Sequence, residues 1–288
     1  MDYFSLVKDR KSIRSFKDNA VSEDDQNAVV SFFRDKCHKL LPEIATEVQI
    51  FSGTAGDQLE GVIGYQGFAF HAPYYLFILS AKADGMYENA GYIGEDMILK
   101  LTEMGLDSCW LSLPADTDPA GMLGYHGDKT TAAVIAFGYG VPEKDTARID
   151  IKSPSDVKVT EREGHIAPKI AEEEMVFQDV YGGAVDWENT VAPSLDQALY
   201  GATLAPSFLN LQEYRYIMGN GKLLLLSRAD EDTTEWDQKL DLGATMLNFA
   251  VCIEQSIYPD VAWKLGKPAD LWELGDTRGF EVAAYCNI

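Results

Sequence analysis

Two short stretches of this sequence carry polar side chains in patterns that could bind an anion and a flat polar ligand. Residues 10–16 place two arginines, a lysine and two serines within seven positions. Guanidinium groups match a phosphate edge through paired hydrogen bonds, so these side chains could converge on one phosphate group. Residues 204–212 contain an Ala-Pro-Ser turn. Because proline fixes its own φ and lacks an N–H, the N–H groups that follow, with Ser207 and Asn210, could face a planar polar ligand.

Each stretch also has a simpler explanation. A basic run near a chain start often forms a solvated surface, and an Ala-Pro-Ser turn often does no more than end a helix. The overall charge strengthens the functional interpretation of the first stretch. The 24 basic and 46 acidic residues give a net charge of −22, so any anion site must be a local basic island.

The composition indicates a globular protein. A chain of 288 residues with 46% hydrophobic residues can form one large domain or two similar halves, each with its own core. The acidic balance disfavours nucleic acid and anionic membranes as partners. The N-terminus lacks a signal-peptide pattern, and the longest nearly apolar run, residues 72–81, is too short to span a bilayer. We therefore expect a cytoplasmic protein with neither nucleic-acid nor membrane partners.

Other chemistries find no support in the spacing of reactive residues. The cysteines are scattered and form no Cys-x-x-Cys pair, so neither a disulfide framework nor a zinc site is indicated. The histidines lack metal-ligand spacing, and no Gly-x-Ser-x-Gly elbow occurs. We therefore predict no metal site and nominate no catalytic side chain.

The elements that must position the two stretches follow a pattern that occurs twice. In the first half the apolar run 74–79 predicts a buried strand, residues 92–104 a helix ended by Gly105, and residues 131–138 a second strand. The second half predicts a hairpin, a helix and a strand, at residues 214–226, 240–254 and 281–285. Residues 144–189 lie between them as an acidic, irregular connector.

The recurring order suggests a diverged internal duplication. The alternative is that any chain with mixed helices and strands can show such an order by chance, because no repeat is visible residue by residue.

Both opening motifs resemble the FMN-dependent nitroreductase family, which has an Arg-Arg-Ser-Ile-Arg-x-Phe run and an Ala-Pro-Ser-x-x-Asn-x-Gln-Pro-Trp turn. Residues 94–110 resemble the central helix of that family and the Gly-Leu-Gly-Thr-x-Trp turn after it. Residues 135–142 resemble the next strand and its Gly-Tyr-Pro turn. The second half, around residues 241–249, is similar to a branch described as TM nitroreductases.

The resemblance implies an α+β, nitroreductase-like fold with two similar α+β halves that form an intrachain pseudo-dimer. The expected division is a first half at 1–145, a connector at 146–189 and a second half at 190–288. Family members normally bind each FMN at a homodimer interface, with the basic run from one subunit and the Pro-Ser turn from the other. Here the two motifs lie in different halves of one chain. We therefore expect one complete FMN site between the halves, a degenerate second site, and a pseudo-dimer that needs no second chain.

The resemblance also implies roles for particular residues. Those expected to bind the phosphate or ribityl oxygens are Arg10, Lys11, Ser12 and Arg14. Those expected to line the flavin are Pro206, Ser207 and Asn210, together with Gly105 and Leu106, whose backbone donors would approach the pyrimidine edge of the ring. The sequence departs from the family pattern at Glu213-Tyr214, which replace Pro-Trp. It also lacks a clear late basic pair, for which Arg148 or Lys152 could substitute.

The implied function is that of an FMN-dependent oxidoreductase. It would pass reducing equivalents from NAD(P)H through FMN to a nitroaromatic, a quinone or a similar small acceptor. An alternative is a non-catalytic flavin- or nucleotide-binding protein, which the altered Glu213-Tyr214 rim would suit. A dinucleotide-binding motif at residues 138–143 is disfavoured because the third glycine is missing and a proline stands where the helix would begin.

Overall fold

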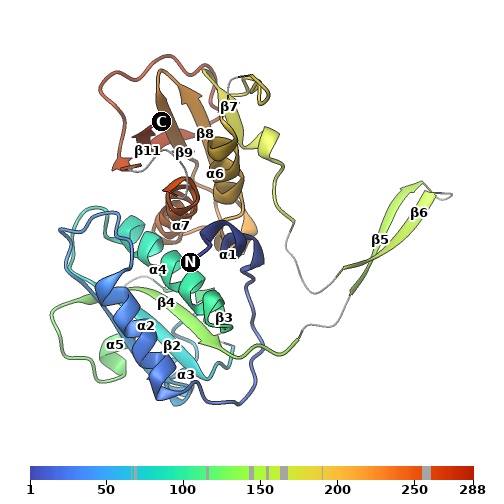
Figure 1. The fold of residues 1–288 in the computed structure, drawn as a ribbon. Coiled ribbons are helices and arrows are strands. Elements are labelled where there is room, and N and C mark those ends of the chain that lie inside the picture. Colours follow the sequence, from blue (N-terminus) through green and yellow to red (C-terminus); the bar gives the residue numbers. More distant parts are fainter. Residues whose placement is uncertain are drawn as a thin grey trace.

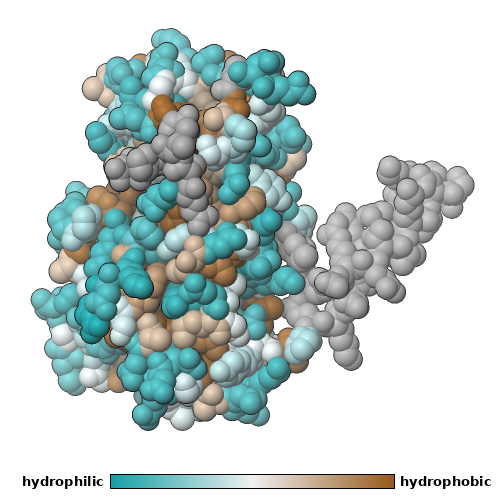
Figure 2. Space-filling model, viewed as in Figure 1, coloured by the Kyte–Doolittle hydropathy of each residue, from teal (hydrophilic) through white to brown (hydrophobic). Residues whose placement is uncertain are grey.

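The computed structural model describes residues 1–65, 67, 70–114, 117–142, 146–153, 156–162, 168–189, 191–254 and 261–288; at 146–153 and 156–162 it describes the backbone alone. In this part of the chain the elements form two α+β units that meet through one long helix from each (Figure 1). Hydrophilic side chains cover most of the face shown in Figure 2, in keeping with the charge of −22. None of the described helices is both long and apolar enough to cross a membrane.

The first unit is built on an antiparallel sheet with the strand order β1-β2-β4-β3. Its strands are β1 (Thr46–Ser52), β2 (Tyr74–Ser80), β3 (Asp107–Leu111) and β4 (Thr130–Gly138). The two central strands are buried on both faces, which explains their unbroken apolar sequences. The apolar runs that predicted them are therefore confirmed as β2 and β4.

Helices cover both faces of this sheet. They are α2 (Glu23–Asp35), α3 (Thr54–Leu59), α4 (Met86–Glu103) and α5 (Pro119–Met122). Ile78 and Ile135 pack in the core that contains α2 and α4, whereas Phe77 and Val134 belong to the core on the side of α3 and α5. This division follows from the alternation of side chains along a strand.

The second unit has a sheet with the order β10-β11-β9-β8-β7, in which only β7 and β8 run parallel. Its strands are β7 (Val176–Gln178), β8 (Tyr214–Gly219), β9 (Lys222–Ser227), β10 (Lys264–Leu265) and β11 (Glu281–Asn287). The predicted hairpin is confirmed, because β8 and β9 are joined by Asn220 and Gly221, both with positive φ. Such a two-residue loop matches the right-handed twist of the strands.

Three helices pack on the inner face of the second sheet, namely α1 (Tyr3–Asp9), α6 (Pro193–Thr203) and α7 (Glu235–Glu254). Short 3₁₀ turns, η1 (Glu172–Glu174) and η2 (Phe208–Asn210), complete the described elements of this unit. Because α1 comes from the N-terminal end of the sequence, the first residues of the chain are part of the second core.

The two units are joined by helices α4 and α7, whose backbones touch at two glycines. A Cβ atom added to Gly91 would lie 2.1 Å from the carbonyl oxygen of Leu240, and one added to Gly243 would lie 2.2 Å from that of Glu88. Real Cβ atoms do not approach so closely, so both positions require glycine. Each unit therefore contributes one glycine to a reciprocal contact, as expected for two halves that form an intrachain pseudo-dimer.

The connector is more regular than its composition suggested. The expectation of an irregular segment at 144–189 is wrong, because the segment contains the antiparallel hairpin β5 (Thr146–Ser153) and β6 (Asp156–Arg162), followed by η1 and β7. The hairpin extends from the rest of the molecule in Figure 1. Apolar and polar residues alternate along both of its strands, a pattern typical of strands that the many acidic residues obscured.

The helices also begin earlier than predicted. Helix α4 starts at Met86 and not near residue 92, and α7 starts at Glu235 and not near residue 240. The division into residues 1–145, 146–189 and 190–288 stays a prediction, although β7, from the expected connector, pairs with β8 of the second sheet. The internal duplication likewise stays a hypothesis.

Candidate functional site

The first motif begins where α1 ends. Asp2 caps this helix by accepting a hydrogen bond from the N–H of Ser5, and the hydroxyl of Tyr3 donates to Asp96 of α4 at 3.1 Å. Val7 is buried against the second sheet. Arg10 follows as the C-cap residue, with its N–H bonded to the carbonyl of Leu6. The position of Arg10 is therefore fixed by contacts to both units.

After Arg10 the chain runs in an extended conformation along the edge of the first sheet. Ser12 pairs with Ser108 of β3 in a parallel bridge, and the N–H of Ile13 donates to the Ser108 carbonyl at 2.9 Å. Further along, the N–H of Lys17 donates to Tyr139 at 2.8 Å. Side chains alternate along an extended chain. Because Ile13 is buried, Ser12 and Arg14 lie on the opposite side of the chain from Ile13.

Arg10 and Arg14 lie close enough to Cys109 on β3 for their charges to act on its thiol. Burial raises the pKa of this thiol, while the charges of Arg14 and Arg10 and a hydrogen bond from Ser12 lower it. The Arg10 side chain also donates from Nη1 to the Ser12 hydroxyl at 3.4 Å. The structure therefore gathers three of the four residues predicted to bind a phosphate group.

The cations of the first motif differ in their surroundings. The side chain of Arg10 is 9% exposed, and its Nε lies 3.5 Å from Oε1 of Glu95, which is fully buried on α4. The other oxygen of Glu95 accepts a hydrogen bond from the indole of Trp110 at 3.4 Å. Burial raises the pKa of Glu95, and the charge of Arg10 opposes this shift. Arg10 is thus held by a buried carboxyl group.

Lys11 and Arg14, by contrast, are exposed. In the part of the chain that the structure describes, neither side chain has a hydrogen-bond or ion-pair partner. Exposed cations without a protein partner on a chain of charge −22 fit an anionic group such as a phosphate. Within the described residues, the donors available to such a ligand are the exposed cations of Lys11 and Arg14. Arg10 and the Ser12 hydroxyl lie beside them in the sequence.

The second motif is a strained turn. Leu209, Asn210 and Gln212 have φ values of +48°, +58° and +54°, a conformation that residues other than glycine rarely adopt. Both carboxyl oxygens of Asp241, on α7, accept a hydrogen bond from the N–H of Phe208, at 3.0 and 2.9 Å. Strained backbone of this kind persists only where surrounding contacts fix it, and it is concentrated at functional sites.

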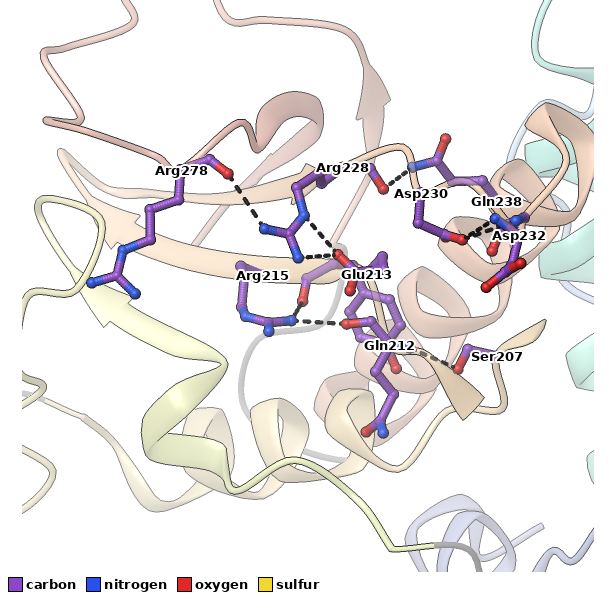
Figure 3. A network of polar contacts seen from close by, with 11 residues as sticks. Ser207, Gln212, Glu213, Arg215, Arg228, Asp230, Asp232, Gln238 and Arg278 are labelled. Carbon is purple, nitrogen blue, oxygen red and sulfur yellow. Dashed lines mark hydrogen bonds and ion pairs between the residues drawn. The ribbon is translucent and has the colours of Figure 1, made fainter. Parts of the chain in front are cut away.

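The polar side chains of this turn are engaged within the protein. The hydroxyl of Ser207 accepts a hydrogen bond from the N–H of Gln212 at 3.1 Å, as Figure 3 shows. The amide of Asn210 donates to the carbonyl of Pro168 at 2.7 Å. Pro206 is partly exposed and opens the turn. Ser207 and Asn210 therefore hold the shape of the turn with the groups that were expected to face a ligand.

The structure also explains the residues that replace the Pro-Trp pair. Glu213 accepts hydrogen bonds from Nε and Nη2 of Arg228, at 2.9 and 2.8 Å (Figure 3). The guanidinium of Arg228 lies over the ring of Phe280, 4.6 Å from its centre. Tyr214 is buried in the core of the second unit. Glu213 is thus paired with Arg228, which directly follows β9, and Tyr214 packs in the core of the second unit.

A third segment connects the two motifs. Lys169 donates a hydrogen bond from Nζ to the carbonyl of Ala205 at 2.5 Å. Burial and, after it, the charge of Arg10 lower the pKa of this lysine to about 8, whereas Glu95 and Asp241 oppose the shift. Lys169 thus bonds to the backbone of the second motif and is within range of the charge of Arg10 from the first. The rings of Tyr65 and Phe208, 5.9 Å apart, form another contact between the units.

Gly105 and Leu106 are used differently from the expectation. Gly105, with φ of +73°, ends α4, and its N–H donates to Thr102 while that of Leu106 donates to Leu101. These two bonds form a Schellman cap, which satisfies the last carbonyls of the helix. Leu106 is buried in the core of the first unit. Both backbone donors are therefore occupied, and the two residues position the start of β3 at Asp107.

The family of the chain follows from a comparison with known proteins. A family model described as "Putative TM nitroreductase" matches residues 2–176. The chain belongs to this family. Nitroreductases are oxidoreductases, and this is the functional class of the protein. A search of curated proteins finds no match.

One solved structure supports the fold. A nitroreductase from Thermotoga maritima is 16% identical and superposes with a TM-score of 0.60 over 100% of this chain and 94% of that chain. The expected nitroreductase-like α+β fold is thereby confirmed. A nitroreductase with bound FMN from Bacteroides fragilis is 17% identical, with a TM-score of 0.42 over 56% of this chain and 100% of its own length.

Two site residues of this nitroreductase family member were missed in the sequence. Glu95 lies on the apolar helix α4, where its position gives no sign that it meets Arg10, which is 85 residues earlier in the sequence. Lys169 is an isolated base before an acidic run, which reads as solvated surface. The side chains of Arg148 and Lys152, which could have served as the late basic pair, lie outside the described part of the structure.

Proposed function

We propose that this protein is an FMN-dependent oxidoreductase of the nitroreductase type, with NAD(P)H as electron donor and a small acceptor such as a nitroaromatic or a quinone. FMN, when bound, would supply the hydride and electron transfer. The protein would bind the cofactor, orient it and control access to it. We assign no catalytic acid or base to a side chain.

In this proposal the phosphate of FMN binds at the first motif. Arg10, Ser12 and Arg14 would hold it, with Lys11 directed toward the phosphate or the ribityl oxygens. Arg14 and Lys11 are free in the described residues to make these contacts, while Arg10 is oriented by Glu95. Because the phosphate is doubly charged at neutral pH, each charge-assisted contact would stabilise binding by about 1.5–3 kcal/mol.

The flavin ring would lie against the second motif. Pro206, Ser207 and Asn210 would shape the wall next to it mainly with their backbone, because the Ser207 hydroxyl accepts from the N–H of Gln212 and the Asn210 amide donates to Pro168. Gly105 and Leu106 would act from a distance by setting the start of β3. The proposal therefore has one complete FMN site per chain, formed by both halves, and the pseudo-dimer needs no second copy for it.

The observation that supports the proposal most strongly is the meeting of the two motifs. They are almost two hundred residues apart in sequence, yet Lys169 bonds to Ala205 beside the second motif and is close enough to Arg10 for the two charges to interact.

The test is a reduction assay on the protein with its flavin. NADH or NADPH, added without oxygen, should bleach the flavin absorbance near 450 nm, and a quinone or a nitroaromatic should then restore it. Failure of both nucleotides to bleach the bound flavin would contradict the enzymatic proposal. It would favour the alternative of a non-catalytic flavin-binding protein.

The alternative has less support than the sequence suggested. It depended on Glu213-Tyr214 as an altered rim of the site. In the structure Glu213 is paired with Arg228 and Tyr214 is buried, so neither residue presents a free group to a substrate.

A further inference from the structure

Lys169 is held in place by several contacts although it lies within the expected connector, residues 146–189. The Pro168 carbonyl accepts a hydrogen bond from the amide of Asn210 at 2.7 Å. The N–H of Ile170 donates to the side chain of Gln212 at 3.1 Å. Bonds on both sides of Lys169 thus attach this short segment to the strained turn. The side chain of Lys169 is therefore placed by the second motif as firmly as Arg10 is placed by α1.

The ammonium group of Lys169 has more donors than the protein uses. It can donate three hydrogen bonds, but in the described residues it makes a single one, to the carbonyl of Ala205. It forms no ion pair there, since Glu95 is engaged by Arg10 and Trp110, and Asp241 by the N–H of Phe208. Burying an ammonium group with unused donors costs free energy unless another acceptor forms hydrogen bonds with them.

Like charges add to this cost. Arg10 is a second cation, close enough for its charge to act on Lys169. Of the acids that face Lys169, Glu95 from α4 forms an ion pair with Arg10 at 3.5 Å, and Asp241 from α7 accepts from the N–H of Phe208. Two neighbouring cations that are both shielded from water favour an anion between them. A phosphate group, with its several strong acceptor oxygens, meets this requirement better than a carboxylate does.

We propose that Lys169 is a further cofactor-binding residue, which contacts the phosphate of FMN together with Arg10. The inference rests on the proposed function, because it concerns the same site. It means that three chain segments build this site, the third being the stretch that leads from the β5–β6 hairpin into the second half. The chain between the halves would then be part of the binding site and not a passive linker.

The proposal predicts a pH dependence that a structural role would not produce. A free ammonium that titrates near pH 8 loses its charge as the pH rises from 7 to 9, so the affinity for FMN should fall by about tenfold over this range. Riboflavin lacks the phosphate, so its affinity should not change in this way.

The experiment uses the full-length protein freed of flavin, and it measures dissociation constants by quenching of flavin fluorescence at pH 7 and 9. Lys169→Met should weaken FMN binding at pH 7 by at least about tenfold and leave riboflavin binding nearly unchanged. Lys169→Arg should restore the affinity and abolish the loss at pH 9, since arginine does not titrate there. Lys239→Met, which removes a lysine paired with Glu235 on α7, is the matched control.

Three outcomes would overturn the inference. FMN affinity of Lys169→Met within twofold of the wild type would show that the lysine does not contact the phosphate. An equal loss for riboflavin and FMN would show that it supports the fold or the ring. No binding of either flavin by the wild-type protein would contradict the proposed function itself, and this inference with it. If Lys169→Met does not fold, the pH profiles of the wild type and Lys169→Arg decide.

Discussion

The first motif leaves its charged groups free, whereas the second motif uses its polar groups to hold its own shape. Arg14 and Lys11 are exposed and unpaired within the described residues, and the extended backbone that carries them is unstrained. In the second motif Ser207 and Asn210 bond to neighbouring backbone, and the chain adopts left-handed conformations. The first motif therefore keeps cations available to a ligand, whereas the second motif uses its polar groups to fix its own conformation.

The difference shows that a motif does not reveal how its residues are used. Both stretches suggested side chains that contact a ligand. In the first, the sheet edge fixes the backbone, so the side chains can be spared for binding. The second motif is not paired with a sheet edge, and its own side chains take part in fixing the turn, together with Asp241 of α7. We expect mutations in the two motifs to affect binding and stability in opposite proportions.

The largest effect on stability is expected at the contact between α4 and α7, which joins the two units that carry the motifs. Gly243→Ala would place a Cβ 2.2 Å from the backbone of α4, so the helices must separate. We expect a loss of about 3 kcal/mol in the free energy of unfolding, measured by urea titration. FMN binding should fail together with folding, because neither motif makes a complete site alone.

Gly182→Ala serves as a control for this variant. Gly182 has a φ of +78° and no atom near its missing Cβ, so it reports the conformational cost of alanine without a clash. This cost is about 1 kcal/mol. Equal destabilisation of the two variants would show that α4 and α7 do not depend on close contact.

The next effect separates the two motifs directly. Arg14→Ala should weaken FMN binding by about 1.5–3 kcal/mol, or roughly tenfold to a hundredfold, since a charge-assisted contact is lost. The melting temperature of the flavin-free protein should hardly change, because Arg14 has no described partner. Arg34→Ala, which removes an exposed arginine paired with Asp35, should leave both quantities unchanged. Unaltered FMN affinity in Arg14→Ala would contradict the assignment of the first motif.

The opposite pattern is expected in the second motif. Asn210→Gly keeps the left-handed backbone but removes the bond to Pro168, so it should cost about 1 kcal/mol of stability. FMN affinity should change by no more than a few fold. A large loss of affinity without a loss of stability would show that Asn210 contacts the flavin directly, and it would erase the distinction between the motifs.

The smallest effect is expected at the residue that departs from the family pattern. Glu213→Gln breaks an ion pair with Arg228, whose side chain is 40% exposed, so water screens much of the interaction. We expect a loss of stability of about 0.5–1 kcal/mol and no change in turnover with any acceptor. A changed preference among acceptors would show that Glu213 does line the substrate site.

The fold was predictable where burial gives a clear pattern. The central strands β2, β4, β8 and β9 are unbroken or hairpin-linked apolar runs, and such runs have few other interpretations. The start of α4 was missed because Gly91, directly before the predicted start, lowers helix propensity. Gly91 and Gly94 allow close packing against α7 and Trp110, which is a tertiary effect that a local pattern cannot contain.

The site was predictable only in part. The basic run at Arg10 was visible because its residue types match a phosphate. Glu95 and Lys169 were not, since their importance comes from where the fold brings them. The donors of Gly105 and Leu106 were assigned to a ligand because a sequence does not show that a helix end requires them first. Groups needed by secondary structure are the ones that a motif comparison most easily misassigns.

The central claim is that one chain forms one FMN site from two different motifs. The most direct test is to purify the protein, denature it and quantify the released flavin against the protein by chromatography, with reconstitution in excess FMN. The account predicts one FMN per chain. Two FMN per chain would show that the second site is intact, and no FMN even after reconstitution would show that the motifs no longer bind a flavin.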